Sequence, residues 1–216
     1  DGQTIDFQGA VTIGTLNTAA QGYNVRFGNG GTVTNAVTFS NTGSLVIANG
    51  MTFTSGVVAT APGSKSIAGT IAASGTGVIN LGTSATTVTA NATVGGTSTG
   101  QITLAGVTIN DGVTLTLGGG AASPVTAGAI AGVAGGAASN VTINVADNAA
   151  NPLVQLASIG TDIGTVTVTQ SSGVVVTGTI TATTVILTDT RDGQTIDFQG
   201  AVTIGTLNTA AQGYNV

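Results

Sequence analysis

Apolar and polar residues alternate in short runs along this chain. Residues 4–7, 24–27 and 44–47 follow one another at offsets of 20, and each run places its apolar residues second and fourth. Alternation with a period of two is typical of a β-strand with one buried face. Later apolar pairs recur less evenly, and turn-forming pairs such as Asn29-Gly30 and Asp111-Gly112 separate the runs. The pattern therefore predicts an all-β protein made of many short strands.

The chain also contains a much longer repeat than this local pattern. Residues 1–25 recur without a change at 192–216, an offset of 191 residues. Identity over 25 residues does not arise by chance, so we read 1–191 as one repeat unit and 192–216 as the start of the next identical unit. We expect the chain to be a segment of a longer tandem array, with a deliberately designed repeat protein as the alternative.

Short strands of this kind can build an antiparallel sandwich, a barrel or a parallel solenoid. The offset near 20 favours the solenoid because it stacks equivalent residues in successive coils. The small residues Ala, Gly, Thr and Val also suit a narrow interior, whereas a sandwich usually contains larger aromatic anchors. We predict a parallel β-solenoid with about 20–23 residues per coil, and an advance of about 40 Å per unit at roughly 4.8 Å per coil. The Gly- and Ala-rich stretch 118–138 is expected to leave the coil.

This coil length makes two predictions about register. Asp6 and Arg26 both lie between apolar neighbours, so they should point outward from adjacent coils and lie within reach of a salt bridge. The second copy, 192–216, should lie at the opposite end of the molecule from residues 1–25. Its Ile196 should then stack on the preceding coil, at Val174.

Composition excludes several classes of function. The chain has eight acidic residues, three basic residues and a formal net charge of −5. Such a chain offers no basic surface for nucleic acid. The absence of His and Cys removes zinc sites, Cys nucleophiles, His-based triads and disulfides. Long uncharged stretches exist, but Thr, Ser, Asn and Gly interrupt them every second or third position, so we predict no membrane insertion.

One acidic cluster is a candidate metal site. Asp189, Arg191 and Asp192 lie close together in the sequence, and Asp197 follows in the next predicted strand. Ca²⁺ binds six to eight oxygens, which carboxylates and turn carbonyls can supply. Asp189, Asp192 and Asp197 are therefore the candidate calcium ligands. The alternative is a solvated turn at the boundary between units, in which Arg191 neutralises its neighbours and no cofactor binds.

The remaining aspartates are the candidates for a catalytic acid–base pair. A polysaccharide-active enzyme is one possibility for a β-solenoid, and a general acid–base pair needs two carboxyl groups within several ångströms. The remaining acidic residues of the unit interior fall on scattered coils: Asp6, Asp111, Asp147 and Asp162. The sequence therefore predicts that the protein is not an enzyme.

Thr-x-Thr triplets suggest a binding face. Each triplet places an apolar residue inward and two hydroxyl groups outward. They begin at positions 32, 52, 87, 114 and 165, and only the first two keep the coil period. A Thr-rich face that binds ice or glycans is thus the alternative function, while the preference of Thr for exposed strands explains the triplets without one. An aromatic glycan platform has few candidates, of which Tyr23 and Tyr214 are the best.

Thr-, Val-, Gly- and Ala-rich coils without Cys, such as AVTIGTLNTAAQGYNVRFGNGGTVTNAVTFSNTGSLVIANG, resemble the repeat regions of giant bacterial surface proteins. Autotransporter passenger domains, including rickettsial outer-membrane surface antigens, and haemagglutinin-like filaments are the nearest families. The resemblance implies a right-handed β-helix, secretion to the cell surface, and a role in adhesion, coating or fibre formation. It brings no catalytic residues. We therefore expect an extracellular structural module whose partners are further copies of the repeat, stacked head to tail, and surface glycans.

Overall fold

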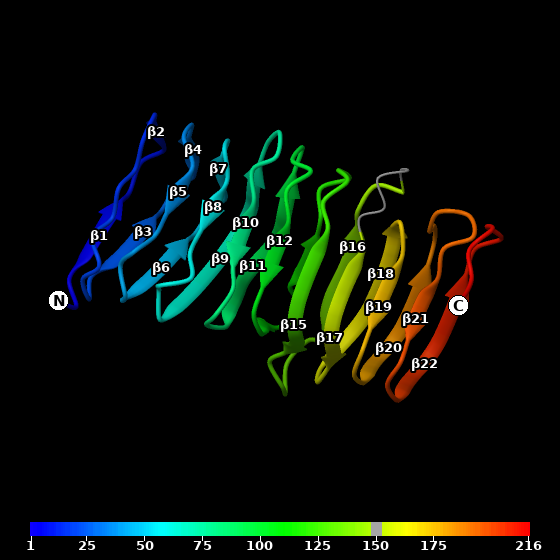
Figure 1. Ribbon diagram of the computed structural model, residues 1–216. Coiled ribbons are helices and arrows are strands. Elements are labelled where there is room, and N and C mark those ends of the chain that lie inside the picture. Colours follow the sequence, from blue (N-terminus) through cyan, green and yellow to red (C-terminus); the bar gives the residue numbers. More distant parts are fainter. Residues whose placement is uncertain (148–152) are drawn as a thin grey trace.

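The computed structural model describes residues 1–147 and 153–216. The described residues form 22 strands and no helix, and every paired strand runs parallel to its neighbour. The strands are stacked into an elongated solenoid, with the N-terminus at one end and the C-terminus at the other (Figure 1). It has about 9 turns and about 22 residues per coil, which confirms the predicted β-solenoid.

The strand pairings define three stacks, which we call faces A, B and C. Face A contains β1 (Thr4–Phe7), β3 (Asn24–Phe27), β6 (Ser44–Ile47), β13 (Val107–Ile109), the first parts of β9 (Ser64–Ala73), β11 (Thr86–Gly96), β20 (Ile180–Leu187) and β22 (Val202–Thr209), and the last parts of β15 (Val125–Gly132) and β17 (Val154–Gly160). Face B contains β2 (Val11–Ile13), β4 (Gly31–Val33), β7 (Met51–Phe53), β14 (Thr114–Leu117), β16 (Ser139–Asn144), β18 (Ile163–Gln170) and the last parts of β9, β11, β20 and β22. Face C contains β5 (Val37–Thr38), β8 (Val57–Val58), β10 (Ile79–Leu81), β12 (Ile102–Leu104), β19 (Val174–Val176), β21 (Ile196–Phe198) and the first parts of β15 and β17.

The first coils have the spacing that the sequence predicts. Asp6 is in register with Arg26, and the Arg26 Nη1 atom lies 2.9 Å from Asp6 Oδ1. This confirms both the coil length and the outward direction of the two side chains. The pair is partly exposed, so it contributes only about 0–1 kcal/mol to stability.

The Gly- and Ala-rich stretch departs from expectation. We predicted that residues 118–138 leave the coil, but Val125–Gly132 forms β15, which is in register with both preceding and following coils. The prediction was wrong because alternation survives in this segment. Val125, Ala127 and Ile130 point inward and are buried, whereas Thr126 and Ala129 between them are exposed.

The interior is a continuous apolar core in which equivalent residues stack from coil to coil. Near the N-terminal end it contains an aromatic ladder. The rings of Phe7 and Phe27 stack with centroids 5.2 Å apart, and Phe39 and Phe53 continue the ladder through edge-to-face contacts. Phe27, Phe39 and Phe53 are completely buried, so they are among the strongest packing contributions in these coils.

Glycine turns close the corners at the predicted positions. Gly30 and Gly50 both have φ of 70°, a left-handed conformation that other residues adopt only at a cost. A Cβ atom on Gly50 would also lie 2.8 Å from the carbonyl oxygen of Thr70 in the next coil. The preceding residues stack as well, since Asn49 Nδ2 donates to Asn29 Oδ1 at 3.2 Å. These corners therefore hold successive coils in register.

Candidate functional site at the repeat junction

The junction between the two copies lies inside this chain. The second copy begins at residue 192, and its strands are seated on the last coil of the first unit. β21 pairs with β19 on face C, where Ile196 is in register with Val174 and Phe198 with Val176. β22 pairs with β20 along its whole length on faces A and B. The stacking of Ile196 on Val174 that the sequence predicts is thus confirmed, and the two copies lie at opposite ends of the molecule (Figure 1).

Apolar burial at the junction is as complete as in the core of the unit. Ile196 has no exposed surface, and Val174 and Val176 are each 1% exposed. The backbone ladder also continues without a break: Val174 N donates to Thr195 O at 3.1 Å, and Ala210 N donates to Leu187 O at 2.9 Å. The contact between copies is therefore an ordinary coil-on-coil contact.

The turn that opens the second copy connects it to the coil that follows. Asp192 Oδ1 accepts a hydrogen bond from Gly213 N at 3.1 Å, and Gly193 N donates to Gly213 O at 2.8 Å. The first copy makes the same contacts, because Asp1 Oδ1 accepts from Gly22 N at 3.0 Å. The carboxylate thus closes one coil onto the next at the same place in both copies.

The three candidate calcium ligands have separate surroundings. Asp192 accepts the hydrogen bond from Gly213, and Asp197 Oδ2 accepts one from Gln199 Nε2 at 2.9 Å. Asp189 is half-buried just after β20, and its carbonyl oxygen accepts from the Thr190 hydroxyl at 2.9 Å. In the part of the chain that the structure describes, no three acidic residues lie close enough together to hold a metal ion. The described residues therefore provide no cluster of carboxylate ligands for Ca²⁺, and calcium binding stays a prediction from the sequence.

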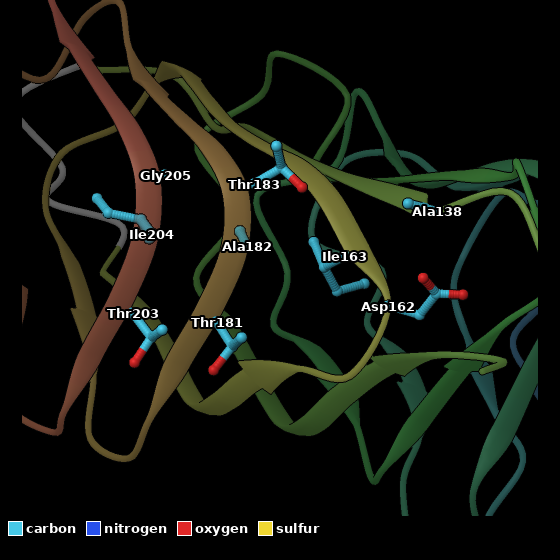
Figure 2. A pocket seen from close by; sticks show the side chains of 9 residues that line it. All are labelled: Ala138, Asp162, Ile163, Thr181, Ala182, Thr183, Thr203, Ile204 and Gly205. Carbon is cyan, nitrogen blue, oxygen red and sulfur yellow. The ribbon is translucent and has the colours of Figure 1, made fainter. Parts of the chain in front are cut away.

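A shallow depression of about 420 Å³ crosses the junction at the corner between faces A and B (Figure 2). It is lined by residues of both copies: Ala138, Asp162, Ile163, Thr181, Ala182, Thr183, Thr203, Ile204 and Gly205. Asp162 is the one ionisable side chain in this lining, and its Oδ2 atom is buried without a hydrogen-bond partner. A single carboxylate among threonines provides no acid–base pair, so the depression offers no built catalytic site.

Lys65 is a polar residue of the core that our reading of the sequence missed. It lies on face A in register with Leu45, points inward and is only 3% exposed. Its Nζ atom donates to Gly82 O at 3.4 Å and to Ser84 Oγ. Burial lowers the pKa of Lys65 from its ordinary value of 10.5. The signal was present in the sequence, because the Ser64–Ile67 run at offset 20 has Lys where the preceding run has Leu.

The threonines form columns on face B that the triplet spacing alone did not show. One column joins five successive coils: Thr70, Thr93, Thr116, Thr142 and Thr167. The triplets that begin at Thr114 and Thr165 therefore share a face, contrary to our expectation that only the first two triplets keep the coil period. They stack because the intervening coils are longer than 20 residues. The column ends at Thr167, because the residue in register with it in the next coil is Ile186.

Comparison with known proteins found no match to a family model, to a curated protein or to a solved structure. The described residues also include no helix of the length and apolarity that crossing a bilayer requires.

Proposed function

We propose that this chain is a structural repeat module of a long secreted or cell-surface bacterial fibre, in which units stack end to end into a rod. The observation that carries the proposal is the internal junction, where identical sequence continues the solenoid with Ile196 fully buried on Val174. The resemblance to the coils of giant bacterial surface proteins supports an extracellular setting. The proposed role is mechanical, with no catalytic step.

The two ends of the molecule support head-to-tail stacking. Ile5 is 49% exposed on the first coil, and Val202 and Leu207 are 44% and 46% exposed on the last. Exposed apolar side chains beside unpaired strand edges favour association with another β-edge. The edge that fits is the opposite end of the same unit, because the equivalent of Ile5 is already buried at the internal junction. Such a heterologous contact does not close on itself, so it extends into a filament.

Electron microscopy of tandem arrays tests this proposal. Arrays of one, two and three units should be straight rods that lengthen by about 40 Å per added unit, at about 4.8 Å per coil. The 216-residue chain should also associate end to end at high concentration. Rods that do not lengthen with unit number, or a chain that stays monomeric at every concentration, would overturn the proposal. Labelling of intact source cells with an antiserum against the unit tests the surface location.

A second candidate function is supported by the five-threonine column. Adjacent to it on face B, Thr114, Asn140, Thr165, Thr184 and Thr206 form another outward column. Two parallel rows of hydroxyl and amide groups at the coil spacing form a regular surface that could order water or bind an extended glycan. We propose binding of ice or glycans as the alternative role of this face.

Ice recrystallisation assays test the alternative. If face B binds ice, Thr116→Lys and Thr142→Lys should abolish inhibition of recrystallisation, because each places a charged chain in the centre of the column. Thr108→Lys on face A is the matched control and should leave the activity unchanged. Absence of activity in the unmodified protein removes ice from the candidates, and a glycan array then tests the remaining ligand class with the same variants.

A further inference from the structure

The two identical segments do not lie on the same face of the solenoid. In the first copy, β1 begins the stack of face A, where Ile5 is in register with Val25. In the second copy, the equivalent residue Ile196 is in register with Val174 on face C. The same sequence therefore occupies two different sides of the rod.

The second strand of the repeat shows the same displacement independently. Val11 belongs to face B, where it is in register with Gly31. Its equivalent, Val202, belongs to face A, where it is in register with Ile180. The start of the following coil agrees as well, because Thr195 pairs with Asn215 next to face C just as Thr4 pairs with Asn24 on face A.

The register explains the displacement. Counted from β1, the chain returns to face A eight times, the eighth time as β20, and it then crosses face B and enters face C as β21. One unit of 191 residues thus contains eight whole coils and two further faces. At about 22 residues per coil, 191 residues do not make a whole number of coils.

We propose that each successive copy docks on the previous one turned by one face, about a third of a turn, so that the array regains its orientation only after three copies. This inference rests on the proposed end-to-end stacking, and the partner at the junction is a second copy of the same unit in one defined rotation. Residues that lie on face A in one copy therefore have their equivalents on face C in the next copy. In the same way, face B passes to face A and face C passes to face B. The threonine columns of face B consequently appear on all three sides of the rod in turn.

The rotation determines how the rod presents its surface. A ligand that binds one patch of the unit is displayed in three directions, at an axial spacing of about 40 Å from one copy to the next. Two rods cannot associate side by side through one stripe of repeated residues, because the equivalents of those residues in the next copy lie on another face. The fibre is therefore suited to contact partners on every side and to resist bundling through one face.

Disulfide mapping tests the rotation in the 216-residue chain, which contains no Cys of its own. Val175 and Asp197 are directly in register on the outward side of face C. Paired neighbours in a parallel sheet have Cα atoms about 4.8 Å apart, within the range that a disulfide bridges. The double variant Val175→Cys/Asp197→Cys should therefore cross-link on mild oxidation. The matched positive control is Asp6→Cys/Arg26→Cys, which joins the equivalent residue of the first copy to its own neighbour on face A.

The alternative arrangement has its own pair. If the unit held a whole number of coils, Asp197 would stay on the column of Asp6 and lie on Thr181, so Thr181→Cys/Asp197→Cys would cross-link instead. That result overturns the rotation, as does failure of both test pairs while the control pair cross-links. The outcome is separate from the test of end-to-end stacking, because arrays can lengthen without any rotation, and this chain can show the rotation without associating.

Discussion

Residues 1–25 and 192–216 have the same sequence but different surroundings, which separates what the sequence determines locally from what the neighbouring coil determines. The contacts of the opening turn are the same. Asp1 and Asp192 both accept a hydrogen bond from the glycine amide 21 residues later. Gly2 and Gly193 both have φ of 76°. The turn chemistry is therefore a property of the segment itself.

The strands differ between the copies. β2 covers only Val11–Ile13, whereas the same residues in the second copy begin β22, which continues to Thr209. Their neighbours differ in the same way, since β2 pairs with the three-residue β4 and β22 pairs with the eight-residue β20. Strand length here follows the partner strand, as expected when β-propensity depends on context.

Burial differs most at the first apolar residue of each copy. Ile5 is 49% exposed because no coil lies beneath it in this chain, while Ile196 is fully buried on Val174. The comparison shows that a preceding coil is enough to bury this side chain completely. The surface that Ile5 exposes in this chain is the equivalent of the one that packs on Val174 at the junction, as stacking of repeat units requires.

The largest predicted effect is a difference in the free energy of unfolding between the same substitution at Ile196 and at Ile5. Ile196→Ala should lower the free energy of unfolding by about 2–5 kcal/mol, because it leaves a cavity in the buried junction. Ile5→Ala, the matched control of identical local sequence, should cost less than about 1 kcal/mol because half of the side chain is already in water. Chemical denaturation gives both values, and limited proteolysis of 192–216 locates the loss. Equal costs at the two positions would contradict the buried junction.

Lys65 and Leu45 form a second comparison, between two different residues at equivalent positions of adjacent coils on face A. Leu45 and Lys65 are in register and both point inward. The described chain pairs no carboxylate with Lys65, so its charged form bears a desolvation cost in the folded state. Lys65→Met should therefore stabilise the protein near neutral pH, by about 1 kcal/mol. Thermal denaturation measures this, and a loss of stability would show that the bonds to Gly82 and Ser84 outweigh the desolvation.

The pH dependence of this difference has a defined sign. Because burial lowers the pKa of Lys65, the folded protein releases its proton at a lower pH than the unfolded chain does. The desolvation cost is complete below the lowered pKa and disappears as pH rises toward 10.5, so the wild-type protein gains stability in that window relative to Lys65→Met. Unfolding of both proteins across this pH range measures the difference. A constant difference at all pH values would contradict the lowered pKa.

The turn aspartates should respond alike in the two copies. Asp1→Ala and Asp192→Ala each remove one hydrogen bond to a backbone amide, at a cost of about 0.5–1.5 kcal/mol. Hydrogen exchange at Gly22 and Gly213 should accelerate in the corresponding variant and not in the other. If only one of the two amides were affected, the turn chemistry would not be a local property of the segment.

The smallest predicted effect concerns the ion pair on face A. Asp6→Asn should reduce stability by about 0–1 kcal/mol at low salt and by less at high salt, because it breaks the partly exposed pair with Arg26. Asp197→Asn is the matched control, since that carboxylate accepts a hydrogen bond from Gln199 and is in register with Val175, which carries no charge. Denaturation at two salt concentrations compares them. A salt-dependent loss for Asp197→Asn alone would contradict the assignment.

Much of this architecture follows from the sequence. The offset of 20 between Asp6 and Arg26 predicts both the coil length and the ion pair, because outward residues on stacked strands meet at one coil spacing. The stack of Ile196 on Val174 is likewise predictable from the repeat. The threonine columns were not, since later coils lengthen and a constant period fails to align Thr116 with Thr142. The face occupied by the second copy was not predicted either, because it depends on the summed length of every coil before it.

X-ray fibre diffraction from an oriented array of many units tests the central claim most directly. If each copy is turned by one face, the structure repeats along the axis only every three units, and layer lines should appear at a spacing of about 125 Å, at about 4.8 Å per coil. If the unit contained a whole number of coils, every layer line would index on the single-unit advance of about 40 Å, and that result would contradict the account.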